Sequence, residues 1–304
     1  MRLSICIVNW NTSDLLAECL RSIQHVGADP RVCPSTEATE QPRVCPSSDV
    51  EVIVVDNASA DFDEEKFRRE FPDALFIRSE QNEGYAHGNN QAIARSSGEY
   101  ILLLNPDTVV REGTLEALVR FMDEHPEAGA AGCKLIKPDG TIDPSCRAFP
   151  TPMAVAFEYL GLSKLFPKNK LFARYRMTWF NYDEIIEIDQ PMASSLIIRR
   201  AALDNVGLFD EEFPIFFNDV DWCRRAKNAG WRIYFTPTAV VTHYGGASTK
   251  QIRLQMIEES HRSLVRYYDK HYAGLANLPA RLMVRAGAWL NLRLLRQYGR
   301  ELRG

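Results

Sequence analysis

The sequence lacks the features that mark several common classes of protein. It has seven cysteines, an odd number, and no Cys-x-x-Cys pair. A disulfide framework and a zinc site are therefore disfavoured, and a reducing cytoplasm is the expected location. No apolar run reaches the roughly 18 residues that a membrane-spanning helix needs. The first strand pattern, which begins at Leu3, is too short for the core of a signal peptide.

The sequence also lacks an excess of positive charge. It carries 36 Lys and Arg against 40 Asp and Glu, a formal net charge of −4, so we expect no nucleic-acid partner. With 45% hydrophobic and 25% charged residues, the 304-residue chain has the composition of a folded globular protein. This length predicts one main domain with an appendage.

Strand and helix patterns alternate along the first part of the chain. Short apolar runs predict strands at residues 3–8, 50–55, 75–78 and 100–104, and amphipathic patterns predict helices at 13–23, 64–71, 88–94 and 114–125. Such alternation indicates βαβ units. The predicted fold class is therefore α/β, Rossmann-like, with a central, mostly parallel sheet flanked by helices.

The remainder of the chain is less regular. It predicts a helix at 219–229, strands at 232–235 and 239–242, and a helix at 252–272. The Pro-Asp-Gly-Thr turn at 138–141 predicts a hairpin on the far side of the sheet. Residues 31–48 contain two copies of Arg-Val-Cys-Pro-Ser, which we interpret as an inserted surface loop. We expect a main domain at 1–250 and a C-terminal helical region at 251–304.

Polar residues follow three of the predicted strands, at 9–12, 56–59 and 105–107. Each group alone is typical of a helix cap. Together they favour a ligand site, because ligands of open α/β sheets bind at the carboxyl ends of the strands. Residues 9–12 contain no glycine, so the phosphate turn of a dinucleotide-binding fold is absent and a nicotinamide-dependent dehydrogenase is disfavoured.

Further groups in the sequence carry candidate chemistry. Gly84 precedes a helix, where it allows either a flexible loop or close approach of the backbone to a ligand. Asp219 and Asp221 begin a helix, which the helix dipole favours. The aromatic residues at 216–217 would desolvate a carboxylate and raise its pKa, as a general base needs, and this fits Asp219 better. His243, structural when considered alone, is a candidate cation ligand together with Asp107.

Taken in order, these groups resemble the inverting GT-A glycosyltransferases of family 2, most closely the bacterial rhamnosyltransferase-like branch. The resemblance spans roughly residues 3–270. It rests on short motifs at 7–11 (IVNWN), 54–59 (VVDNAS), 82–86 (NEGYA), 88–90 (GNN), 104–107 (LNPD), 138–141 (PDGT), 218–221 (NDVD) and 243–246 (HYGG).

The resemblance implies transfer of a sugar such as rhamnose, with inversion, from a dTDP-, UDP- or GDP-linked donor to a hydroxyl of a glycan or lipid-linked acceptor, in surface polysaccharide biosynthesis. It implies that Asp219 is the catalytic base and that Asp107 and His243 bind Mg²⁺ or Mn²⁺. The residues implied to form the nucleotide-sugar pocket are Asn9, Asn11, Asp56, Asn57, Gly84, Asn89 and Asn105.

Two positions depart from the family pattern. Asn105 replaces the first acid of the metal-binding Asp-x-Asp, so metal binding is expected to be weaker or to depend on His243 and on the donor diphosphate. Asn218 replaces the Glu of the Glu-Asp pair and leaves the base in place. A non-catalytic, sugar-nucleotide-binding scaffold subunit is the alternative, and the retention of both Asp107 and Asp219 argues against it. A sugar nucleotidyltransferase would need a basic, glycine-rich loop near the N-terminus. Residues 9–12 are neither basic nor glycine-rich, so this class is disfavoured.

The C-terminal tail, from about residue 280, is basic and amphipathic. On an ideal helix its arginines fall within a sector of roughly 120°, which Leu282, Trp289 and Leu292 interrupt. They are Arg281, Arg285, Arg293, Arg296, Arg300 and Arg303. Such a helix either lies on an anionic membrane, here the cytoplasmic face of the inner membrane, or packs on its own domain or on a second copy in a homodimer.

Overall fold

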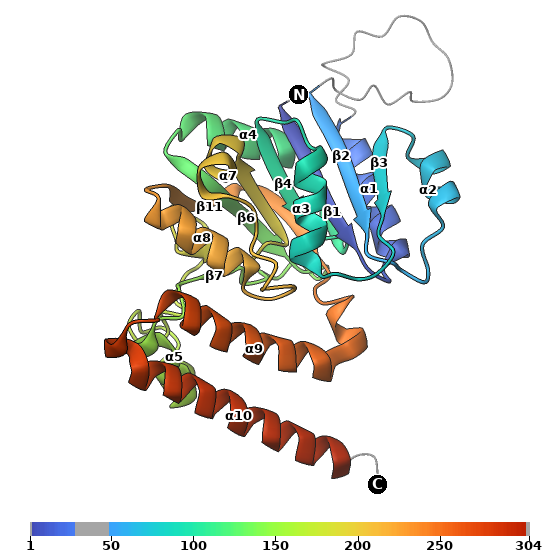
Figure 1. Cartoon of the computed structure of the whole chain (residues 1–304). Helices are drawn as coiled ribbons and strands as arrows, with labels where there is room; N and C mark the ends of the chain where they lie inside the picture. Colours follow the sequence, from blue (N-terminus) through green and yellow to red (C-terminus); the bar gives the residue numbers. More distant parts are fainter. Residues whose placement is uncertain (1, 28–48, 302–304) are drawn as a thin grey trace, which may run out of the picture.

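The computed structural model describes residues 2–27 and 49–301 (Figure 1). The insertion predicted at 31–48 lies outside the described residues. A central sheet carries helices on both of its faces, and two long helices lie beneath one end of it (Figure 1). The predicted fold class and the C-terminal helical appendage are confirmed. The five cysteines in the described part of the chain are buried and free.

The first half of the chain forms the βαβ units that the sequence predicts. Strands β1 to β4 run parallel in the order β3-β2-β1-β4, so their carboxyl ends meet at one edge of the sheet. The elements are β1 (Leu3–Asn9), α1 (Ser13–Gly27), β2 (Val50–Asp56), α2 (Glu64–Glu70), β3 (Ala74–Arg78), α3 (Tyr85–Arg95) and β4 (Tyr100–Leu104).

The second half extends this sheet from β4 through β10, β6 and β11 to β5. β10 is antiparallel to both of its neighbours, so the complete sheet is mixed. The elements are β5 (Thr108–Val110), α4 (Thr114–Glu124), β6 (Ala128–Ile136), β7 (Cys146–Arg147), α5 (Pro152–Tyr159), α6 (Leu162–Leu165), β8 (Ile186–Glu187), β9 (Gln190–Pro191), β10 (Ser195–Arg199), α7 (Arg200–Val206), α8 (Asn218–Asn228) and β11 (Arg232–His243).

Several strands differ from the sequence-based expectation, among them the short strands β5, β7, β8 and β9, which have no predicted counterpart. The strands predicted at 232–235 and 239–242 are one strand, β11, whose pairing with β6 shifts register between Thr236 and Val240. The interior strands β6 and β10 were not predicted. β6 reads AGAAGCKLI, and alanine and glycine have low strand propensity, so burial between neighbouring strands determines its conformation.

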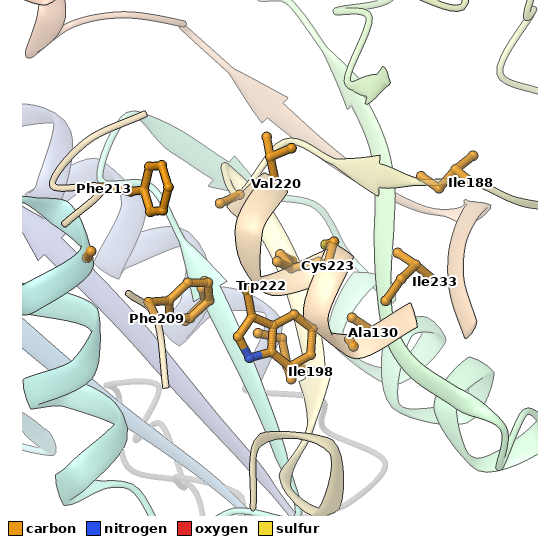
Figure 2. Close-up of a cluster of buried hydrophobic side chains, with 14 of the residues drawn as sticks. Ala130, Ile188, Ile198, Phe209, Phe213, Val220, Trp222, Cys223 and Ile233 are labelled. Carbon is orange, nitrogen blue, oxygen red and sulfur yellow. The ribbon is translucent and has the colours of Figure 1, made fainter. Parts of the chain in front are cut away.

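Helix α8 is anchored to the sheet by its apolar side. Trp222 is fully buried, and its Nε1 donates a hydrogen bond to the carbonyl oxygen of Gly207 at 2.9 Å. Figure 2 shows Val220, Trp222 and Cys223 of α8 among buried side chains that include Phe209 and Ile198. Because this side of α8 is packed in the core, the position of its first turn is fixed.

The C-terminal helices α9 (Arg253–His271) and α10 (Leu278–Glu301) pack against each other. Val284 of α10 is fully buried, and Arg285 of α10 forms an ion pair with Asp269 of α9 at 2.8 Å. Figure 1 shows the two helices stacked beneath the carboxyl ends of the parallel strands. Within the described residues, no helix has the length and hydropathy to cross a bilayer.

Candidate active site

A cavity of about 300 Å³ lies where the parallel strands β1, β2 and β4 end. One wall carries Asn57, Asn105 and Asp107, which follow β2 and β4. The lining also includes Asp219, from the first turn of α8. The two carboxylates that the sequence singles out, far apart along the chain, therefore line one cavity.

Asp107 is held in a chain of three side chains, in which Asp107 and His243 are buried and Asp143 is partly exposed. Its Oδ1 lies 3.4 Å from His243 Nε2, and the other ring nitrogen of His243, Nδ1, lies 2.8 Å from Asp143 Oδ2. His243 is the last residue of β11 and pairs with Thr108 of β5 in the antiparallel register, which brings it beside Asp107. The backbone N–H of Ala247 donates to Asp107 Oδ2 at 3.3 Å.

Asp143 is a site residue that the sequence did not reveal. The hairpin around 138–141 was expected on the far side of the sheet, and this expectation is wrong. β6 runs parallel to β11, so its carboxyl end, and the turn that follows it, reach the same edge as His243. The antiparallel bridge between Ile136 and Ile142 then brings Asp143 back toward the histidine. Without β6 in the predicted sheet, the turn could not be placed.

The electrostatics of this group favour charge on every member. Burial acts to lower the pKa of His243, but the carboxylates of Asp107 and Asp143 on its two sides outweigh burial and raise the pKa to about 9. Burial acts to raise the pKa of Asp107, but the neighbouring His243 and the amide of Ala247 hold it below its usual range. Without metal, the histidine is therefore a cation between two carboxylates at neutral pH.

Asp219 has the opposite electrostatics. Its Oδ1 accepts a hydrogen bond from the N–H of Val220 at 2.8 Å, and its Oδ2 accepts one from the N–H of Ala193 at 3.3 Å. Burial raises the pKa of Asp219 above its usual range despite these amides. A carboxylate with a raised pKa accepts a proton more readily, which is the property expected of a general base.

Asp221, two residues further on, is engaged elsewhere. It is fully buried and contacts Arg225 of α8 together with Lys270 and His271 of α9, at 2.7 to 2.8 Å. Burial would raise its pKa, but these partners lower it to about 2. Asp221 is thus a fixed anion that joins α8 to α9, and of the two acids Asp219 alone lines the cavity.

Asn218 supports the loop that precedes α8. Its Nδ2 donates hydrogen bonds to the carbonyl oxygens of Phe213 at 3.2 Å and Ile215 at 2.9 Å. A glutamate carboxylate could not donate either bond. The asparagine at this position therefore shapes the cavity wall next to Asp219.

The residues predicted for the nucleotide-sugar pocket divide into two groups. Asn57, Gly84 and Asn105 line the cavity. Asn57 Oδ1 is buried without a hydrogen-bond partner among the described residues, while its Nδ2 donates to the Gly84 carbonyl oxygen at 3.0 Å. Because buried polar atoms are normally paired, this oxygen is available to a ligand donor.

The other predicted residues do not line the cavity. Asn9 and Asp56 are fully buried, and Asn9 Nδ2 donates to Asp56 Oδ1 at 2.8 Å. Asn11 accepts a hydrogen bond from the Ala60 N–H, and Asn89 Nδ2 donates to the Tyr85 carbonyl oxygen. These contacts stiffen the loops behind the cavity, and direct nucleotide contacts by these residues stay predictions.

Several further lining residues were not predicted as site residues from the sequence. Ile252 and Met256 reach the cavity from the region of α9, and Ala193 and Ser194 reach it from the segment before β10. Tyr85 also lines the cavity, and its hydroxyl donates to the Ala193 carbonyl oxygen at 3.1 Å. These residues approach the site through tertiary packing, which local sequence patterns do not report.

The order of the sheet and the cavity at the carboxyl ends of its parallel strands fit the GT-A fold, and the comparisons with known proteins agree. The chain belongs to glycosyl transferase family 2, whose profile, described as "Glycosyl transferase family 2", matches residues 4–171. This family membership, together with the relatives described next, identifies the protein as a glycosyltransferase.

Two curated relatives are rhamnosyltransferases by name. N-acetylglucosaminyl-diphospho-decaprenol L-rhamnosyltransferase of Mycobacterium tuberculosis is 27% identical over 261 residues, which cover 81% of this chain and 83% of that protein. Rhamnosyltransferase WbbL of Escherichia coli is 26% identical over 172 residues, 53% of this chain and 61% of that protein. The predicted rhamnosyltransferase-like branch is thereby confirmed.

Solved structures share the fold. Mannosyltransferase PcManGT of Pyrobaculum calidifontis, in complex with GDP-Man and Mn²⁺, aligns with a TM-score of 0.57 at 18% identity, over 99% of this chain and 80% of that chain. S. aureus TarS 1-349, in complex with UDP, aligns with a TM-score of 0.52 at 18% identity, over 91% and 74%.

Proposed function

We propose that the protein is a metal-assisted, inverting glycosyltransferase of surface polysaccharide biosynthesis. It moves a sugar, such as rhamnose, from a nucleoside diphosphate to a hydroxyl of a glycan or lipid-linked acceptor. The observation that carries the proposal is that Asp107 and Asp219 line one cavity. The names of the two rhamnosyltransferase relatives support the choice of sugar.

Asp107 and His243 would hold the divalent cation, Mg²⁺ or Mn²⁺. His243 Nε2 is buried without a hydrogen-bond partner among the described residues and lies 3.4 Å from Asp107 Oδ1. A cation ligated by both atoms would satisfy this nitrogen and displace the imidazole proton. Such an ion neutralises the charge that develops on a departing nucleoside diphosphate.

The two side chains do not form a complete metal site. Within the described residues, no cluster of three or more His, Cys, Asp or Glu side chains is placed to hold a metal. The remaining ligands would come from the donor diphosphate and water, which is common for magnesium bound with substrate phosphates. Metal and donor should therefore bind together.

Asp219 would take the proton of the acceptor hydroxyl as its oxygen attacks the anomeric carbon. The amides of Val220 and Ala193 fix both carboxylate oxygens, so the base needs little reorganisation. The hydroxyl proton passes to Asp219, the new bond forms on the face opposite the diphosphate, and the bond to the diphosphate breaks. One such displacement inverts the configuration.

The finer assignments of the site and the chain follow from this chemistry. Asn57, Gly84 and Asn105 would contact the donor, with Asn9, Asn11, Asp56 and Asn89 supporting the same pocket. We place the catalytic domain at residues 1–250 and the helical region at 251–304. The lipid acceptor in the mycobacterial relative's name leads us to propose a lipid-linked acceptor and a location at the cytoplasmic face of the membrane.

A thermal-shift series tests the donor side of the proposal. dTDP-, UDP- and GDP-sugars are added with and without Mn²⁺ to the wild type and to Asp107→Ala. A correct donor stabilises the wild type more strongly with Mn²⁺ than without it, and Asp107→Ala loses that increment. Donor binding without hydrolysis or transfer under any condition would instead indicate a non-catalytic scaffold.

A further inference from the structure

Large apolar side chains are exposed along the segment that contains α5 and α6. Leu160 is 72% exposed and Leu165 is 68% exposed, and Phe166 beside them is 45% exposed. Soluble monomers rarely expose such groups together, and apolar patches with a polar rim mark sites of interaction. This segment, which the sequence left as irregular, therefore needs a partner.

Helix α10 has an outward face of the same kind. Its inner side packs on the protein through Val284 and Ala288, which are buried. On the outer side Leu282 and Trp289 are 58% and 59% exposed, and Leu290 is 50% exposed. The helix therefore packs on its own chain, as one of the two readings of the sequence allowed, and still presents an apolar face.

The two exposed regions approach each other at Tyr159, the last residue of α5. A Cβ atom on Gly287 of α10 would lie 2.7 Å from the ring of Tyr159, so the helix backbone rests directly on that ring. At 100° per residue, Leu290 lies within about 60° of Gly287, on the side of α10 next to Tyr159, whereas Trp289 and Leu282 lie about 160° and 140° from it, on the far side of the helix. We call Leu160, Leu165, Phe166, Leu282, Trp289 and Leu290 the docking surface.

The charge around the docking surface is positive. Residues 159–182 contain no acid and five cations, Lys164, Lys168, Lys170, Arg174 and Arg176. Arg176 pairs with Glu158, whereas Lys164, Lys168 and Arg174 form no ion pair with any described residue. On α10, Arg293 lies 5.1 Å from the ring of Trp289 in a cation–π contact.

From these contacts we infer that the docking surface binds an anionic phospholipid bilayer. Exposed leucines with a tryptophan, bordered by lysine and arginine, form the pattern of a helix that lies in a membrane interface. Basic residues near an anionic leaflet add electrostatic attraction to it. In a two-fold dimer through this surface the unpaired cations of the two copies would face each other, so a second copy fits less well.

The biological role of this membrane binding rests on the proposed function. Met256 of α9 lines the cavity, and the same helix packs on α10, so the docking surface and the cavity belong to one end of the molecule. Figure 1 shows α5, α9 and α10 together at that end. A bilayer held there would present lipid-linked acceptors on the side where Asp219 lies.

Vesicle sedimentation of the full chain tests the inference directly. The vesicles are phosphatidylcholine with or without phosphatidylglycerol. We expect the wild type to pellet with anionic vesicles, and the double variant Leu160→Asp/Leu165→Asp and the single variant Trp289→Asp to lose at least about tenfold in partition. The matched control, Leu208→Asp, changes a leucine that is 46% exposed outside this surface and should bind like the wild type.

Three results would overturn the inference. They are undiminished pelleting of the two surface variants, equal pelleting with neutral vesicles, and a wild-type dimer in light scattering that the variants abolish. Circular dichroism and the donor-induced thermal shift check that each variant is folded with an intact donor site. If no donor binds at all, the proposed function is wrong. The vesicle experiment still tests membrane binding independently of that outcome.

Discussion

His243 Nδ1 lies 2.8 Å from Asp143 Oδ2, on the side of the imidazole ring opposite to Asp107. This contact fixes the ring so that Nε2 is directed at Asp107. Where histidine ligates a metal, a carboxylate on its second nitrogen typically sets the tautomer and the orientation of the ring. Asp143 is therefore a positioning residue for the proposed cation site.

Asp143→Ala should weaken Mn²⁺ binding by about ten- to hundredfold, because His243 loses the group that orients it. The Mn²⁺ concentration that gives half of the donor-dependent thermal shift measures this effect. Asp139→Ala is the control, since Asp139 is exposed in the same turn and bonds Thr141 there. Equal Mn²⁺ dependence in both variants would show that Asp143 does not position His243 for the cation.

Gly84→Ala should destabilise the fold and weaken donor binding. Gly84 has φ +98°, and a Cβ atom there would lie 2.7 Å from the Pro214 carbonyl oxygen, in the loop that leads to α8. The backbone strain costs about 1 to 3 kcal/mol, and the clash adds to it. Gly113→Ala is the matched control, because Gly113 has φ +72° and nothing within 4 Å of its Cβ position. Urea denaturation compares the two variants, and a loss at Gly84 no larger than the loss at Gly113 would show that Pro214 shifts to relieve the clash.

Asp221→Asn should lower the free energy of unfolding by about 2 kcal/mol at neutral pH, since the shift of its pKa to about 2 measures the stabilisation of its charge. A carboxylate whose pKa is lower in the folded chain stabilises it above the unfolded pKa of 3.8 and loses this effect as pH falls toward 2. The facing charges are Arg225, Lys270 and His271.

The difference between wild type and Asp221→Asn should therefore shrink by about half between pH 7 and pH 3. Urea denaturation at the two pH values measures it. A difference that stays constant with pH would mean that the carboxylate charge does not stabilise the link between α8 and α9.

Most of the first half of the fold could be predicted because its signals are local. The strands that end at Asn9, Asp56 and Leu104 are apolar, β-branched or leucine-rich runs, and polar side chains follow each of them. Parallel pairing then brings those side chains to one edge of the sheet. Asp107 could be assigned to the site on this basis alone.

The remaining parts depend on contacts that no local pattern encodes. β6 is a strand because β10 and β11 enclose it, so its alanines and glycines gave no signal, and Asp143 was misplaced together with its turn. The docking surface was missed in part because α5 and α10 are distant in sequence and meet through Tyr159 and Gly287. The arginine pattern of the tail predicted only the part of the docking surface that lies on α10.

The central claim is that Asp219 takes the acceptor proton while the donor is held across the cavity near Asp107. Asp219→Asn tests it, with transfer rate and donor affinity measured on the same preparation and Asp139→Asn as an exposed control. The account predicts a loss of transfer of about a hundred- to ten-thousandfold with donor affinity unchanged. A loss of donor affinity that matches the loss of transfer would contradict the assignment of Asp219 as the base.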